Sequence, residues 1–180
     1  MTVVALSGRR IDAPGTTTPR FPAANVDAVR ARIRDALERL GADVLVCSAA
    51  CGADQLALEA AGSLGVTRRV ILPFEESRFR TTSVIDRGVE WGAPFDRTMA
   101  ELHAANAVIT LAGAEDATAS YAAANLAILD DAQALGRTAK AAVVVMLVAE
   151  GDAAYEGVDG SFAEEAKRRG LPSVSISTRA

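Results

Sequence analysis

Residues 3–10 read VVALSGRR, and residues 44–54 read VLVCSAACGAD. Each stretch begins with apolar, mostly β-branched residues, which are typical of a buried strand, and passes into small residues, which are typical of a tight turn. A segment with helical periodicity lies between them, because Val26, Val29 and Ile33 recur on one helical face. Strand, helix and strand in this order predict a βαβ unit with parallel strands.

The same alternation continues to the end of the chain. Short β-branched runs and stretches of helical periodicity predict further strands over residues 69–72, 107–111, 141–148 and 173–176, and helices over residues 26–40, 52–64, 95–105, 121–135 and 161–169. We expect Asn25 and Ser161 to cap helices at their N-termini, and Gly41 and Gly136 to end helices. The pattern predicts an α/β fold of three layers, a parallel sheet of about six strands with helices on both faces, formed by residues 1–180 as one domain.

Composition and charge exclude several classes of protein. Hydrophobic residues make up 50% of the 180 residues and the net charge is −4, so the chain is expected to fold and offers no basic face to DNA. The longest apolar run, residues 141–149, is much shorter than the ~20 residues of a membrane-spanning helix, and residues 1–10 lack the pattern of a signal peptide. These features predict a cytoplasmic protein that binds no membrane, and they disfavour DNA as a partner.

Cysteine and histidine are too scarce for a metal site. The chain has two cysteines, Cys47 and Cys51, and one histidine, His103. Their spacing matches neither a zinc site nor a redox motif. We therefore expect no metal and no bound cofactor, and two small, partly buried thiols in a reducing compartment.

The loops that follow the strands hold the candidate binding residues. Parallel strands joined by right-handed crossovers end at one edge of the sheet, where ligands bind. Ser7 and Gly8 end the first strand with side chains small enough for a ligand to approach the backbone. Residues 52–55 open a helix whose free N–H groups favour a phosphate. Guanidinium groups suited to phosphate lie in the same loops, at Arg9, Arg10, Arg80 and Arg87.

Two well-known nucleotide motifs are absent. The chain contains no G-x-G-x-x-G fingerprint with a downstream acid and no G-x-x-x-x-G-K-[ST] loop. This absence excludes a nicotinamide-dependent dehydrogenase and a P-loop NTPase.

Residues 73–96 differ in composition from the rest of the chain. They contain three phenylalanines and the only tryptophan, Trp91, and almost no alanine. One interpretation is a functional loop or lid over the site. The other is a short amphipathic segment that packs Phe74, Phe79 and Trp91 onto the core, and both interpretations are compatible.

Two stretches resemble the SLOG superfamily, the sensor domains related to Lonely-guy and DNA-processing protein A: residues 6–12 (LSGRRID) and 47–54 (CSAACGAD). The resemblance is strengthened by residues 72–74 (LPF) and 79–91 (FRTTSVIDRGVEW). The resemblance covers roughly residues 3–150 and implies a Rossmann-like sheet that binds a nucleotide or a nucleotide-derived ligand. Arg9 stands where related sequences often have histidine. Residues 112–118 lack the Pro-Gly-Gly-x-Gly-Thr-x-x-Glu pattern of Lonely-guy phosphoribohydrolases, which argues against that activity.

Residue patterns and resemblance together give one set of candidate ligand-binding residues: Ser7, Gly8, Arg9, Arg10, Asp12, Ser48, Ala49, Gly52, Ala53, Asp54, Pro73, Phe74, Arg80, Ser83, Arg87 and Gly113.

Two functions remain open at this point. The first is a binding module, a sensor or carrier of a nucleotide or its derivative, which would need an effector protein in trans. The second is an enzyme that cleaves or transfers an N-glycosidic bond, which needs a carboxylate near the anomeric carbon. Glu75 is the first candidate for that carboxylate, followed by Asp54, Asp86 and Glu115. Chemistry by serine and histidine is disfavoured, because His103 is expected in a helix away from the site.

The helix expected over residues 119–135 would pack on the sheet or form a homodimer face. The sequence identifies neither the base nor the number of phosphates of the ligand.

Overall fold

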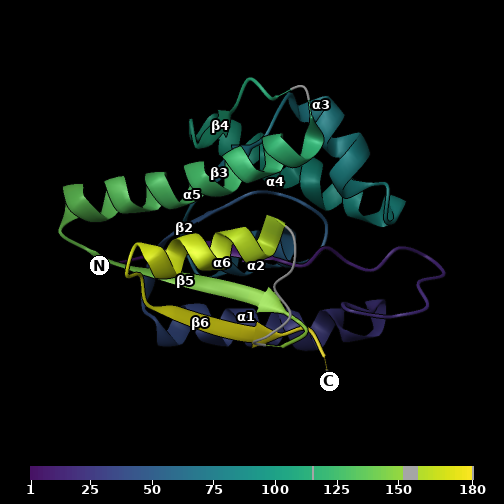
Figure 1. Cartoon of the computed structure of the whole chain (residues 1–180), viewed down its shortest axis with the longest axis horizontal. Helices are drawn as coiled ribbons and strands as arrows, with labels where there is room; N and C mark the ends of the chain where they lie inside the picture. Colours follow the sequence, from purple (N-terminus) through teal and green to yellow (C-terminus); the bar gives the residue numbers. More distant parts are fainter. Residues whose placement is uncertain (115, 152–157, 180) are drawn as a thin grey trace.

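The computed structural model describes residues 1–114, 116–151 and 158–179. Its centre is a six-stranded sheet with the strand order β4-β3-β2-β1-β5-β6, in which all neighbouring strands run parallel (Figure 1). The strands are β1 (Thr2–Gly8), β2 (Ala42–Cys47), β3 (Thr67–Leu72), β4 (Val108–Thr110), β5 (Ala142–Ala149) and β6 (Ser173–Ser177). The predicted α/β fold with a parallel sheet of about six strands is confirmed.

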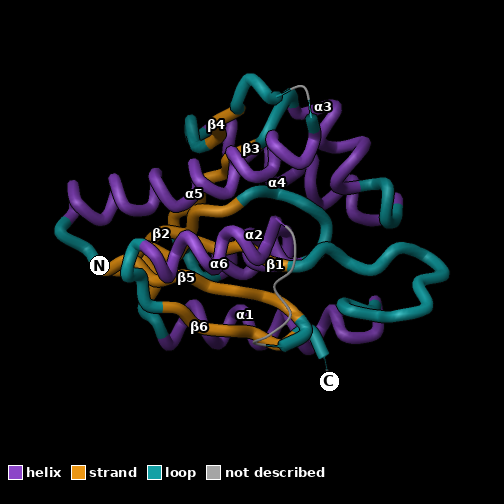
Figure 2. The backbone as a smooth tube through the Cα atoms, in the orientation of Figure 1, coloured by secondary structure: helices purple, strands orange, loops and turns teal. Residues whose placement is uncertain are grey.

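Helices cover both faces of the sheet and complete three layers, as in Rossmann-like folds (Figure 2). On one face lie α1 (Val26–Arg39), α2 (Ala53–Ser63), α3 (Glu76–Phe79) and α4 (Gly92–Ala104), and on the other α5 (Ala117–Ala139) and α6 (Val158–Arg168). Three short turns adjoin these helices: η1 (Ala23–Asn25) before α1, the π-helical η2 (Arg80–Val84) after α3, and η3 (Val89–Trp91) before α4.

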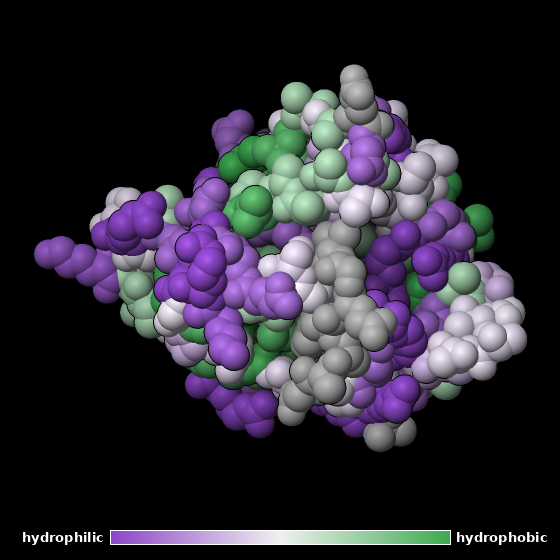
Figure 3. Space-filling model, viewed as in Figure 1, coloured by the Kyte–Doolittle hydropathy of each residue, from purple (hydrophilic) through white to green (hydrophobic). Residues whose placement is uncertain are grey.

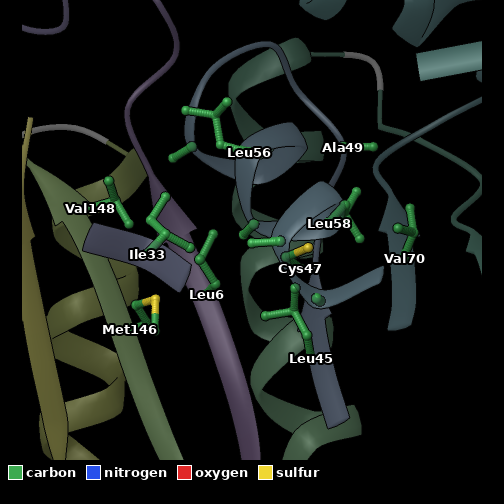
Figure 4. Packing of buried hydrophobic residues seen from close by; sticks show 14 of the residues in the cluster. Leu6, Ile33, Leu45, Cys47, Ala49, Leu56, Leu58, Val70, Met146 and Val148 are labelled. Atoms are coloured by element: carbon green, nitrogen blue, oxygen red, sulfur yellow. The ribbon is translucent and has the colours of Figure 1, made fainter. Parts of the chain in front are cut away.

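The central strand β1 is buried on both faces. Val4 and Leu6 pack in the cluster under α1 and α2, which Figure 4 shows in part, whereas Val3 and Ala5 pack under α5 and α6. All four side chains have no exposed surface. A parallel strand covered on both faces needs a continuous apolar run, which explains why VVAL does not alternate with polar residues.

The chain reverses its direction of travel across the sheet after β4. Strands β1 to β4 follow one another outward, and α5 then returns over the sheet so that β5 pairs with the free side of β1. The strands β1 and β5 are neighbours, but the chain leaves β1 toward α1 on one face of the sheet and leaves β5 toward α6 on the other face. Such a topological switch point leaves a crevice at the carboxyl ends of the strands, where ligands of open α/β sheets bind.

The ends of several helices differ from the sequence-based expectation. Asn25 makes no side-chain cap; its amide donates instead to the Thr178 carbonyl oxygen at 2.9 Å and ties down the C-terminal segment. Ser161 lies inside α6, which begins at Val158. Helix α5 continues past Gly136, where a Cβ would meet Val143 at 2.5 Å, and ends before Lys140, whose φ is 52°. Gly136 thus serves close packing of a helix on a strand. Gly41 follows α1 with a φ of 55°, as expected for a residue that ends a helix.

Residues 73–96 form short helices that pack on the core. Phe74, Phe79 and Phe95 are buried, and neighbouring rings lie 6.1 and 6.3 Å apart between centroids. Trp91 is partly buried against the same cluster. The expectation of an amphipathic segment that anchors aromatic rings is confirmed, and movement of the segment as a lid stays a prediction.

The outer surface of α5 and the edge strand β4 carry exposed apolar side chains. Ala124, Ile128 and Leu129 of α5 are buried, whereas Leu126 is 45% exposed and Ile109 of β4 is 38% exposed. Figure 3 shows hydrophobic surface gathered over these two elements. One face of α5 therefore packs on the sheet. A homodimer through its other face stays a prediction.

No helix within residues 1–114, 116–151 and 158–179 combines the length and the apolar character that crossing a membrane requires.

Close packing at Gly8 gives a first prediction. An added Cβ would lie 2.5 Å from the Cβ of Ala53 and 2.7 Å from that of Val148. We expect Gly8→Ala to lower the free energy of unfolding by about 1–3 kcal/mol, because overpacking pushes strand and helix apart. Urea unfolding followed by circular dichroism measures the change. Gly151→Ala is the matched control, since a Cβ there meets nothing within 4 Å. An equal loss in both variants would contradict the explanation.

Candidate functional site

A cavity of about 350 Å³ lies at the carboxyl ends of β1 and β2. This volume is near the lower end of the ~300–1,000 Å³ range of small-molecule sites. On the face seen in Figure 3, hydrophilic residues gather between the loop after β1 and the short helices of residues 73–91. The lining consists of Leu6, Ser7, Gly8, Arg9, Arg10, Asp12, Arg20, Ser48, Ala50, Asp54, Phe79, Arg87, Tyr121, Ala124, Asn125 and Ile128.

The floor of the cavity is formed where the loop after β1 pairs with the start of α2. The Ala53 N–H donates to the Arg9 carbonyl oxygen at 3.0 Å, and the Ile11 N–H donates to that of Cys51 at 3.3 Å. Gly52 has a φ of 104°, and a Cβ there would lie 2.6 Å from the Ile11 nitrogen. Both its conformation and its neighbours require glycine.

This pairing uses N–H groups that were expected to be free for a phosphate. At the start of α2, the N–H groups of Ala53, Gln55 and Leu56 donate to protein carbonyl oxygens at 3.0, 3.3 and 3.1 Å. The carboxylate of Asp54 accepts the N–H of Ala50 at 3.1 Å. An anion in the cavity would therefore be held by side chains more than by the α2 N-terminus.

Asp12 shapes the loop that brings a further arginine to the site. Its carboxylate accepts the backbone N–H groups of Arg20 and Phe21 at 3.0 Å, and its own N–H donates to the Phe21 carbonyl oxygen at 2.9 Å. These bonds close the loop of residues 12–21. Arg20 thereby lines the cavity although it lies far along the loop from β1.

Arg9 and Arg20 share one carboxylate, that of Glu150 at the end of β5. Arg9 Nε lies 3.0 Å from Glu150 Oε2, and Arg20 Nε lies 2.5 Å from Oε1. The carboxylate is 9% exposed. Burial alone would raise the pKa of Glu150, but hydrogen bonds from its own backbone, Arg20 and Arg9 outweigh burial and hold the pKa below its usual value.

Arg10 and Arg87 form a second pair around Asp86. A terminal nitrogen of Arg10 lies 2.5 Å from both carboxylate oxygens, and Arg87 Nε lies 3.6 Å from Asp86 Oδ2. Arg87 also donates to the Ile11 carbonyl oxygen at 3.2 Å. Among the described residues, the buried Nε of Arg10 has no hydrogen-bond partner. An unsatisfied buried donor is costly and favours a ligand or water that accepts from it.

The charge around the cavity favours an anion. Each of the two carboxylates, Glu150 and Asp86, is shared by two guanidinium groups. The lining itself contains four arginines and two aspartates, and both aspartates accept backbone N–H groups. In a partly buried site, guanidinium groups attract a phosphate more strongly than they would in water.

The opposite wall, formed by α5 and by Phe79 of α3, is largely aromatic and apolar. Tyr121 lies against Phe74 with ring centroids 5.7 Å apart, and its hydroxyl is 2.5 Å from the Ser83 hydroxyl. Ile128 and Phe79 also line the cavity. This wall offers a flat apolar surface to a nucleobase.

The structure brings eight of the predicted ligand-binding residues to the cavity lining: Ser7, Gly8, Arg9, Arg10, Asp12, Ser48, Asp54 and Arg87. The lining does not include the others, namely Ala49, Gly52, Ala53, Pro73, Phe74, Arg80, Ser83 and Gly113. Several of these support the lining from behind: Gly52 and Ala53 through the backbone, Phe74 and Ser83 through Tyr121. Gly113 has a φ of 80° in the loop over Phe74.

Arg80 lies apart from the site. Its guanidinium binds the carboxylate of Asp96 through two hydrogen bonds of 2.7 and 2.8 Å. These partners face solvent at the start of α4, because η2 carries Arg80 on its outer side.

Glu75 and His103, which bear on the catalytic hypothesis, also lie outside the lining. Glu75 caps α3, accepting the N–H groups of Ser77 and Arg78 at 2.8 and 3.1 Å and the Ser77 hydroxyl at 2.6 Å. These hydrogen bonds lower the pKa of Glu75. His103 Nε2 lies 2.6 Å from a carboxylate oxygen of Glu76 on the exposed side of α4. Asp86 holds Arg10, and Glu115 lies outside the described residues.

Sequence reasoning missed Arg20, Glu150 and the residues of α5. Tyr121, Asn125 and Ile128 are spaced by four and three residues, so they share one helical face, and this spacing could have identified them. Arg20 and Glu150 gave no such signal, since they meet only through the folding of two distant loops.

Cys47 and Cys51 are free and buried. In the part of the chain that the structure describes, no group of three or more His, Cys, Asp or Glu side chains could hold a metal ion.

Comparison of the chain with models of known protein families found no match, and a search of curated proteins found none either.

The Glu150 cluster gives a prediction on pH. Since the pKa of Glu150 in the folded protein lies below its usual 4.5, its charge stabilises the fold fully above that value and less as the pH falls. We expect Glu150→Gln to lower the free energy of unfolding by about 1–3 kcal/mol at pH 7. The difference from the native protein should shrink as the pH falls below 4.5.

Urea unfolding at a series of pH values measures both effects. Glu38→Gln is the control, because Glu38 pairs with Arg34 on the exposed side of α1. A difference that stays constant from pH 7 to pH 3 would contradict the assigned role of the Glu150 charge.

Proposed function

We propose that this chain binds a nucleotide or a nucleotide-derived ligand in the cavity at the ends of β1 and β2, as a sensor or carrier. The observation that carries the proposal is the convergence of four guanidinium groups on one cavity, with Arg9 and Arg20 held by Glu150 and Arg10 and Arg87 held by Asp86. A phosphate fits such guanidinium groups.

Three further features support the proposal. The cavity lies beside the switch point of a Rossmann-like sheet, where nucleotides commonly bind. Its Tyr121 wall suits a base. Residues 6–12 and 47–54 resemble the SLOG sensor domains, whose ligands are nucleotide-derived. As a sensor, the chain would transmit ligand binding to an effector protein in trans. The two free thiols suit work in the cytoplasm.

Native mass spectrometry with nucleoside monophosphates and cyclic nucleotides tests the proposal. We expect one ligand of this panel to remain bound, and Arg9→Gln combined with Arg10→Gln to weaken its affinity at least tenfold, since two charge-assisted contacts are lost. Arg34→Gln, on the exposed side of α1, should leave the affinity unchanged. If the native protein retained no member of the panel, the phosphate site would be wrong.

A second candidate function, cleavage of an N-glycosidic bond, is favoured by one residue of the lining. Asp54 is 8% exposed and is the most enclosed carboxylate that lines the cavity. A carboxylate beside the anomeric carbon stabilises the oxocarbenium-like state of such a reaction. Glu75, which was the first candidate from the sequence, caps α3 outside the lining.

Asp54→Asn separates the two functions. The amide oxygen still accepts the Ala50 N–H, so the loop should keep its shape. If the chain is an enzyme, free base and ribose phosphate appear with the native protein and their rate falls at least a hundredfold in the variant, with ligand binding retained. If the native protein releases no base from a ligand that it binds, catalysis is excluded and the sensor function stands.

A further inference from the structure

The ion pair between Arg10 and Asp86 leaves part of the guanidinium group unused. One terminal nitrogen of Arg10 donates to both carboxylate oxygens of Asp86 at 2.5 Å, whereas the strongest pairing of these groups uses two nitrogens side by side. In the described part of the chain, the buried Nε of Arg10 has no hydrogen-bond partner. A phosphate group offers three acceptor oxygens and would satisfy more of these donors than Asp86 does.

Asp86 begins a turn, residues 86–91, that is attached to the loop after β1 by two side chains. Asp86 itself pairs with Arg10. The next residue, Arg87, donates to the Ile11 carbonyl oxygen at 3.2 Å. Loss of the first contact therefore removes one of two attachments of the turn to the floor of the cavity.

The turn joins a fixed segment to the outer surface. Before it, the Ser83 carbonyl oxygen accepts the Cys51 N–H at 3.0 Å, and the Ser83 hydroxyl lies 2.5 Å from that of Tyr121. Within the turn, Val89 is 82% exposed. Release of the turn would therefore change the outer surface while the preceding segment stays attached to the site.

Displacement of Asp86 by a phosphate costs little. The side chains of Arg10 and Asp86 are 28% and 31% exposed, so water reaches both. Ion pairs with such access to water change an equilibrium constant by about fivefold at most. A phosphate monoester carries up to about two negative charges against one on Asp86, and it therefore both competes for Arg10 and repels the carboxylate.

We propose that Asp86 occupies the place of the ligand's phosphate on Arg10 before a ligand binds, and that the phosphate displaces it and releases the turn of residues 86–91. Binding in the cavity thereby changes the surface around Val89, which an effector protein can contact. This inference rests on the proposed nucleotide-binding function and deepens it by naming how the same site is regulated.

Hydrogen exchange of the native protein tests the release, with inorganic phosphate as the probe. The N–H groups of Gly88 and Trp91 donate at 3.3 Å to the carbonyl oxygens of Ile85 and Gly88, which slows their exchange while Asp86 holds the turn. We expect phosphate to speed the exchange of both by about threefold or more, and potassium chloride of equal ionic strength to leave it unchanged. An anion that only covered the turn would slow the exchange. Trp91 is the only tryptophan, so its fluorescence should change with phosphate as well.

Asp86→Asn separates competition from damage to the fold. The amide has the shape of the carboxylate without its charge. We expect the variant to bind phosphate about two- to fivefold more tightly than the native protein, as measured by calorimetry, because the competing ion pair is lost. Its turn should exchange fast without phosphate and respond no further when phosphate is added. A variant that was only damaged would bind phosphate more weakly.

Glu90→Gln is the matched control. Glu90 lies in the same turn and carries the same charge, but among the described residues the ion pair of Arg10 is with Asp86. Its removal has a similar effect on the field at the cavity without freeing Arg10. We therefore expect the phosphate affinity and the exchange of the turn to stay close to the native values.

The possible failures are distinguishable. If phosphate binds the native protein but leaves the exchange and the fluorescence of the turn unchanged, the release is wrong and the proposed function stands. If Asp86→Asn binds phosphate no more tightly than the native protein, or Glu90→Gln gains as much, Asp86 does not compete for Arg10 and the inference is overturned. If phosphate binds neither the native protein nor Asp86→Asn, the phosphate site is wrong, and the proposed function fails together with the inference.

Discussion

Close contact of backbone with backbone, between the end of β1 and the start of α2, is the constraint on which the rest of the site depends. Gly8 lets Ala53 and Val148 approach to distances that no side chain at this position would allow. Gly52 lets the loop after β1 pair with the residues before α2. The two loops thereby form one rigid floor, and the arginines that extend from it have a fixed origin.

The same contact explains why a phosphate in this site would be held by side chains. In many nucleotide-binding folds the N–H groups of a helix start bind phosphate directly. Here, the Ala53 N–H is used in forming the floor, and the N–H groups of Gln55 and Leu56 donate to the carbonyl oxygens of Ala50 and Gly52. Guanidinium groups take over, held in pairs by Glu150 and Asp86. Such shared carboxylates orient the arginines before a ligand arrives, which reduces the entropy lost on binding.

The position of carboxylates bears on the choice between binding and catalysis. The cavity holds Asp12 and Asp54, and both accept backbone N–H groups of their own loops. Asp12 serves the shape of the loop that carries Arg20. Asp54 is the carboxylate with a lining position and low exposure, and it is therefore the residue on which an enzymatic function would depend.

The sequence by itself determined the layers, the parallel sheet and half of the cavity lining. Apolar runs such as VVAL and helical periodicity are local patterns, and each follows from the burial of one segment. Ser7, Gly8, Arg9 and Arg10 were found because a strand end is also a local signal. Only the tertiary structure decided that Arg20 joins Arg9 at Glu150, since 130 residues separate Arg20 from Glu150 and their meeting depends on the strand order.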